Sequence, residues 1–91
     1  MNSNDSSSST KKNYVEVELD TLHYSEKRLH KFVKEVLEKN YTITDRFQSS
    51  VSYILIIETE EDGDRIAYSL CRGFWEVKCA HDRRHDRWTL N

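Results

Sequence analysis

The chain has 91 residues, of which 33% are charged and 36% hydrophobic, and its formal net charge is −2. This length suits one small domain. The near-neutral charge argues against a protein that holds nucleic acid through net positive charge alone. No apolar run approaches the roughly 18 residues of a membrane-spanning helix, and the amino terminus lacks the apolar segment of a secretory signal. We therefore expect an intracellular domain with no membrane partner.

The amino-terminal segment differs in composition from the rest. Its sequence, MNSNDSSSSTKK, offers almost no apolar side chain to offset the entropy lost on ordering. We expect a disordered polar tail over residues 1–13 and a single domain over residues 14–91.

Three patterns predict the elements of the first half of the domain. Apolar and acidic residues alternate from Tyr14 to Leu19, which indicates a short edge strand. Ser25 suits a helix N-cap, and apolar residues at positions 29, 32, 33, 36 and 37 follow the helical period, so we expect an amphipathic helix from about Ser25 to Lys39. A short strand at residues 41–43 and a central strand at residues 51–57 follow.

The second half is interpreted as β-hairpins. Asp62-Gly63 is typical of a two-residue hairpin turn, and Arg72-Gly73 is a second turn candidate. Pairing the strands about these turns keeps the apolar side chains on one face, and a last strand falls at residues 87–90. The predicted class is α+β: one amphipathic helix packed on a four-stranded antiparallel β-meander, preceded by the short edge strand. The open edge of that first strand offers a route to a homo-oligomer.

The carboxy-terminal third combines cations with both tryptophans. Guanidinium and ammonium groups neutralise phosphates, and aromatic rings stack on bases. The alternative of equal weight is a solvated face, with Trp75 in the core. The candidate nucleic-acid-binding residues are Arg72, Lys78, Arg83, Arg84 and Arg87.

The same segment holds the ligand types that zinc prefers. The candidate ligands are Cys71, Cys79, His81 and His85. Their spacing lacks the close cysteine pair of ordinary zinc fingers, and the hairpin register puts the two cysteines on opposite faces. We therefore favour a protein without a cofactor and keep zinc as the alternative. The sequence has no glycine-rich phosphate loop and no nucleophile–histidine–carboxylate set, so we do not expect an enzyme.

Five short segments of the chain carry a resemblance to a known family: Tyr24-Ser25-Glu26, Tyr41-Thr42-Ile43, Cys71-Arg72-Gly73, Trp75-Glu76-Val77 and Trp88-Thr89-Leu90. With these segments in this order, the chain from Thr21 onward resembles the DNA-binding zinc finger of far-red-impaired-response proteins and Mutator-like transposases, in the WRKY–GCM superfamily. A second zinc cysteine of that family would fall at Gly73, and its terminal ligand pair would lie beyond Asn91. The resemblance therefore implies a degenerate or truncated relative without zinc, a DNA partner and a nuclear location.

Two functions follow from these patterns. The first is a noncatalytic DNA-binding module that uses a basic, aromatic-rich β-hairpin near the carboxy terminus. The alternative is a small protein-interaction module, such as a viral or mobile-element inhibitor of a host protein. It is motivated by the near-neutral charge and by residues 58–64, whose sequence ETEEDGD carries five acids and no base. Under this alternative, acidic and sheet-edge surfaces bind the partner.

Overall fold

The computed structural model describes residues 12–84 and 89–90, so most of the predicted polar tail lies outside the described residues. A helix that follows the first strand is built from three consecutive segments, α2, η2 and α3. The elements in chain order are β1 (Asn13–Leu19), α2 (Glu26–Phe32), η2 (Val33–Leu37), α3 (Glu38–Asn40), β2 (Thr42–Gln48), β3 (Tyr53–Thr59), α4 (Gly63–Gly73), β4 (Val77–Asp82) and β5 (Thr89–Leu90).

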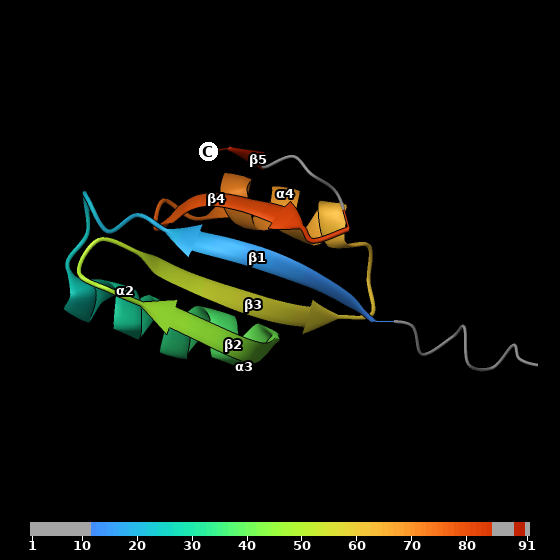
Figure 1. The fold of residues 1–91 in the computed structure, drawn as a ribbon, viewed down its shortest axis with the longest axis horizontal. Helices are drawn as coiled ribbons and strands as arrows, with labels where there is room; N and C mark the ends of the chain where they lie inside the picture. The colour runs from blue at the N-terminus through green and yellow to red at the C-terminus, as the bar shows by residue number, and fades with distance from the viewer. Residues whose placement is uncertain (1–11, 85–88, 91) are drawn as a thin grey trace, which may run out of the picture.

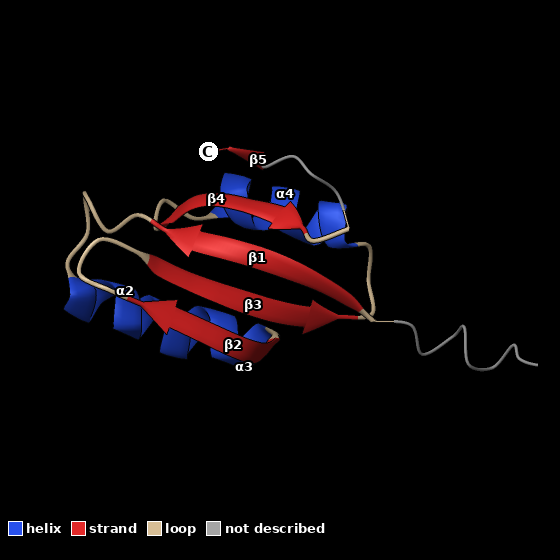
Figure 2. Cartoon of the chain, viewed as in Figure 1, coloured by secondary structure: helices blue, strands red, loops and turns tan. Residues whose placement is uncertain are grey.

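The strands form one antiparallel sheet in the order β2-β3-β1-β4-β5. The α2–α3 helix connects β1 to β2, and β3 lies between these two strands. Likewise, α4 connects β3 to β4, and β1 lies between them. Two interleaved split βαβ units of this kind make a ferredoxin-like topology. Both helices lie behind the same face of the sheet (Figures 1 and 2).

The alternation in β1 decides which face of the sheet is covered. Val15, Val17 and Leu19 are buried, whereas the intervening Glu16 and Glu18 point to the other face. Both helices present an apolar stripe to the buried side chains of β1, β3 and β4. The helix residues in this core are Leu29, Phe32, Val33, Leu37, Ile66, Ala67, Leu70 and Cys71.

The predicted first helix is confirmed. The hydroxyl of Ser25 accepts a hydrogen bond from the backbone N–H of Arg28 at 3.2 Å, as an N-cap does, and the helical segments continue to Asn40. Residues Val33–Leu37 form a π-helical turn within it.

The α+β class and the antiparallel sheet are confirmed, but the meander is wrong. Residues 63–73 form a second helix instead of a hairpin strand. Ile66 and Leu70 lie four residues apart, a spacing that puts them on one face of a strand, whose period is two residues, and also on one face of a helix, whose period is 3.6 residues. Tyr68 separates the two interpretations, because the strand register needs it in the core and it is exposed. Asp62 accepts a hydrogen bond from the N–H of Asp64, so Asp62-Gly63 begins a helix where we expected a turn.

The position of β1 is a further correction. We expected it at an edge, and it lies between β3 and β4 with hydrogen-bonded partners on both sides. The reason is that both connections through helices carry the chain over a neighbouring strand. A second copy therefore cannot pair with β1. Among the described residues, no helix has the length and apolar character needed to span a membrane.

Candidate functional site

Three predicted DNA contacts lie exposed on separate elements. Arg72 is in the last turn of α4, with its guanidinium carbon 5.3 Å from the centre of the Tyr68 ring. Lys78 is in β4, with its ammonium 3.9 Å from a Glu18 carboxylate oxygen. Arg83 follows β4. The fourth, Arg84, is bound to another side chain of the protein. The fifth, Arg87, lies outside the described residues.

Arg84 is engaged within the protein. Its guanidinium donates to the carboxylate of Asp82 at 2.8 and 3.1 Å, and its backbone N–H donates to the same group at 2.9 Å. Asp82 is fully buried. These hydrogen bonds and the charge of Asp82 raise the pKa of Arg84. Its guanidinium therefore compensates a buried charge, a structural role that phosphate binding would disturb.

The predicted zinc ligands are divided between the two faces of the sheet. Cys71 is a residue of α4 and lies in the core between α4 and the sheet. Cys79 pairs with Glu18 in β1, with its Sγ 3.6 Å from a Glu18 carboxylate oxygen. His81 is half-buried in β4, and His85 lies outside the described residues. Burial raises the pKa of the Cys71 thiol, while burial and Glu18 raise that of Cys79 to about 12. Both thiols therefore hold their protons more tightly than an exposed cysteine does.

Within residues 12–84 and 89–90, one group of three side chains has its ligand atoms close enough for a metal ion. Asp62, Asp64 and Asp82 place carboxylate oxygens within 4.8 Å of one another. Arg84 already supplies a cation there, since it lies 2.8 Å from Asp82 and 3.9 Å from Asp62. The group is therefore an internal ion-pair network.

A different surface is prominent in the structure, and we call it the apolar end. Four large apolar side chains lie near one end of the sheet, where β1 and β2 finish and β3 and β4 begin. Leu22 lies between β1 and α2, Phe47 is next to the last residue of strand β2, Val51 is in the β2–β3 loop and Trp75 lies just before β4. Their exposed fractions are 84, 58, 76 and 79%.

Hydrogen bonds join the three loops that carry Leu22, Val51 and Trp75. The Asp20 N–H donates to the Glu76 carbonyl at 2.9 Å, and the Thr21 hydroxyl donates to the Val51 carbonyl at 2.9 Å. Ser49 accepts from the N–H groups of Val51 and Ser52 at 3.3 and 3.1 Å. These hydrogen bonds tie the three loops to one another at this end of the sheet.

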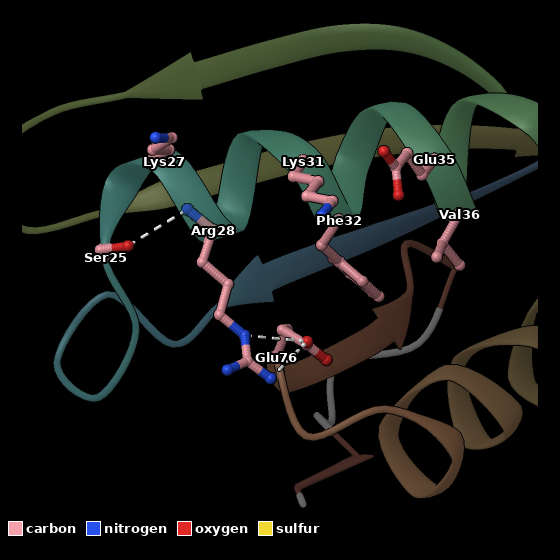
Figure 3. Close-up of a pocket in the computed structure, with 8 residues that line it drawn as sticks. All are labelled: Ser25, Lys27, Arg28, Lys31, Phe32, Glu35, Val36 and Glu76. Carbon is pink, nitrogen blue, oxygen red and sulfur yellow. Dashed lines mark hydrogen bonds and ion pairs between the residues drawn. The ribbon is translucent and has the colours of Figure 1, made fainter.

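Beside the apolar end is a groove of about 530 Å³ between α2 and the turn that leads into β4 (Figure 3). Phe32 and Val36 project into it, and Arg28 reaches across to Glu76 at 3.2 Å. The remaining lining is Ser25, Lys27, Lys31 and Glu35. Three cations (Lys27, Arg28 and Lys31) and two carboxylates (Glu35 and Glu76) thus line the groove together with these two apolar side chains.

Sequence reasoning missed the apolar end. Leu22 stands alone among polar neighbours, and single exposed apolar residues are ordinary. Val51 was predicted to begin the central strand with its side chain in the core, but β3 begins at Tyr53 and Val51 is exposed in the preceding loop. Trp75 was placed in the core by the hairpin register. Only the topology brings these positions to one end of the sheet.

Comparison of the chain with models of protein families, with curated proteins and with solved structures found no match. The resemblance to the WRKY–GCM zinc finger therefore stays a prediction.

Proposed function

We propose that this chain is a noncatalytic protein-interaction module that binds its partner through the apolar end. The observation that carries the proposal is that Leu22, Val51 and Trp75 on three joined loops, and Phe47 near the end of β2, all lie exposed at one end of the sheet. They are four of the six large apolar side chains that are exposed among the described residues. Apolar groups concentrated on one surface typically mark contact with another protein.

The chemistry of these side chains suits a binding site. Burial of a large apolar side chain contributes roughly 1.5–3 kcal/mol, and aromatic residues supply many of the strongest interface contacts. Trp75 and Phe47 give the apolar end two such anchors. Association also costs translational and rotational freedom, so partner burial at this end is compatible with ordinary micromolar affinity.

Affinity capture with the whole chain tests this proposal. The wild type, a triple variant (Leu22→Ser, Val51→Ser, Trp75→Ala) and Tyr68→Ala are immobilised at equal density. Tyr68 is the matched control, because it is a large exposed side chain on α4, away from the apolar end. We expect a protein that the wild type and the control retain and the triple variant releases. Retention of the same proteins by all three would contradict the proposal.

DNA binding is the second candidate, and it rests on the exposed cations Arg72, Lys78 and Arg83. These lie on α4 and at the two ends of β4, so they do not form one compact site. Anisotropy of a labelled duplex at low and physiological salt tests this candidate. Binding that weakens steeply with salt and is lost in the triple variant Arg72→Gln, Lys78→Gln and Arg83→Gln would favour it.

A further inference from the structure

The outer edge of strand β2 is open in this structure. Strand β2 is the first in the order β2-β3-β1-β4-β5, so β3 pairs with one side of it, and no strand among the described residues pairs with the other (Figure 1). Six of its seven residues are exposed, and Ile43 is half-buried. The backbone groups that point outward from such an edge can bind another extended strand.

The register of the β2–β3 hairpin determines which backbone groups point outward. The N–H of Ser49 donates to the carbonyl of Ser52 at 2.8 Å, and the two strands pair onward from there. Residues of an antiparallel pair alternate between hydrogen-bonded and non-hydrogen-bonded positions, so Phe47, two residues before Ser49, directs its backbone groups toward β3. The N–H and carbonyl groups of Arg46 and Gln48 therefore point away from β3.

The side chains of Arg46 and Gln48 are held away from this edge. The guanidinium of Arg46 donates to the carboxylate of Glu38 in α3 at 2.7 Å, and the amide of Gln48 donates to that of Glu26 in α2 at 2.7 Å. Both side chains thus lie on the face of the sheet that the helices cover. Phe47 points to the opposite, uncovered face and is 58% exposed.

We propose that two copies of this chain pair through the outer edges of β2, antiparallel and centred on Phe47. In this register Arg46 of each copy lies opposite Gln48 of the other, and their outward backbone groups exchange hydrogen bonds. The two Phe47 side chains face each other at a non-hydrogen-bonded position, where cross-strand side chains are closest. The sheets of the two copies then form one continuous sheet.

Charge selects this register among the symmetric ones. An antiparallel strand pair with two-fold symmetry places one residue opposite its own copy. A pair centred on Asp45 or Arg46 would put like charges directly opposite each other, which is destabilising, whereas Phe47 gains an aromatic partner. The register of β2 against β3 shifts between Ile43 and Asp45, and this bulge confines regular pairing to the residues after it. A second copy therefore fits this edge in the register centred on Phe47.

Sedimentation velocity over a range of concentrations tests the proposal with Arg46→Pro and Arg46→Ala. Both variants lose the ion pair with Glu38, but only proline also removes the outward N–H, a change that an edge strand tolerates. Because the contact is small, we expect a reversible wild-type dimer that forms above about 100 µM. Arg46→Ala should change the dissociation constant less than about threefold, and Arg46→Pro should raise it about tenfold or more. A wild type that is monomeric at about 1 mM, or equal dissociation constants of the two variants, would overturn the proposal.

Disulfide trapping tests the register without altering the backbone. In mild oxidant Phe47→Cys should cross-link two copies, because opposite residues at a non-hydrogen-bonded position have Cα atoms about 4.5 Å apart, within the range of a disulfide. Asp45→Cys is the control on the same face, since its Cα atoms would lie roughly 14 Å apart in this register. Equal cross-linking of the two variants, or none of Phe47→Cys, would overturn the proposal. Such a failure leaves the proposed function to its own test, because the capture experiment changes Leu22, Val51 and Trp75.

Discussion

The two ends of the sheet differ in whether their prominent side chains have partners within the fold. At the apolar end, loops present large apolar side chains to solvent. At the other end, which we call the ionic end, Arg84 forms ion pairs with Asp62 and Asp82, and Gly63 lies against Asp82. The carboxylate of Asp82 is buried and accepts three hydrogen bonds from Arg84. Charged groups at the ionic end are thus paired within the fold, whereas apolar side chains at the apolar end are exposed to solvent.

Because of this difference, we expect the two ends to contribute differently to the stability of the fold and to affinity for a partner. A side chain whose partners lie within the fold is costly to remove, whereas an exposed one is cheap to remove unless a partner covers it. Substitutions at the ionic end should therefore alter the free energy of unfolding, and substitutions at the apolar end should alter affinity alone.

The largest expected effect is that of Asp82→Ala. It removes the acceptor of the Arg84 hydrogen bonds from a fully buried position. We expect the free energy of unfolding to fall by about 3 kcal/mol in urea denaturation. Arg83→Ala, at the adjacent exposed position, should change it by less than about 0.5 kcal/mol. Equal stability of the two variants would remove the distinction between the ends.

Gly63→Ala should cost about 2 kcal/mol. A Cβ atom at Gly63 would lie 2.4 Å from the Oδ2 atom of Asp82, so the buried carboxylate would have to move. Gly73→Ala is the control within the same helix, because a Cβ atom there meets nothing within 4 Å. Thermal unfolding should place Gly63→Ala below the wild type and Gly73→Ala at or above it. A harmless Gly63→Ala would show that Asp82 is free to move.

Alkaline pH should destabilise the strand that joins the two ends. The Cys79 thiol ionises with a pKa near 9.0 when unfolded, and burial and Glu18 raise it to about 12 in the folded protein. Its contribution to stability is complete below pH 9 and is lost as pH rises toward about 12, with a slope of up to roughly 1.4 kcal/mol per pH unit. Cys79→Ala should show a shallower decline between pH 9 and 11. Identical slopes would contradict the assigned pKa.

The smallest expected effect is at the apolar end. Leu22→Ser, Val51→Ser and Trp75→Ala should each leave the free energy of unfolding within about 0.5 kcal/mol of the wild type. Urea denaturation of each variant measures this. A larger loss in any of them would mean that the side chain supports the fold and is not reserved for a partner.

The sequence predicted those parts of the fold that local periodicity determines. The helix capped by Ser25 and the strand beginning near Tyr14 were both found, because their apolar spacing fits one period. Residues 63–73 were misassigned, since Ile66 and Leu70 satisfy both periods and Asp-Gly suits both a turn and a helix start. Because this helix was taken for a strand, the predicted strand order was wrong and β1 was placed at an edge of the sheet.

The candidate surfaces depended on that topology. Arg84 looked available for phosphate until the fold placed Asp82 beside it. Leu22, Val51 and Trp75 are far apart in the chain, and no local pattern connects them.

The most direct measurement follows the fluorescence of Trp75 in a Trp88→Phe background, so that Trp75 is the remaining tryptophan. In the free protein, acrylamide should quench it efficiently, because its side chain is largely exposed. With a saturating protein partner from the capture experiment, we predict a shift of the emission to shorter wavelength and strong protection from quenching. An unchanged spectrum and unchanged quenching in the complex would contradict binding through the apolar end.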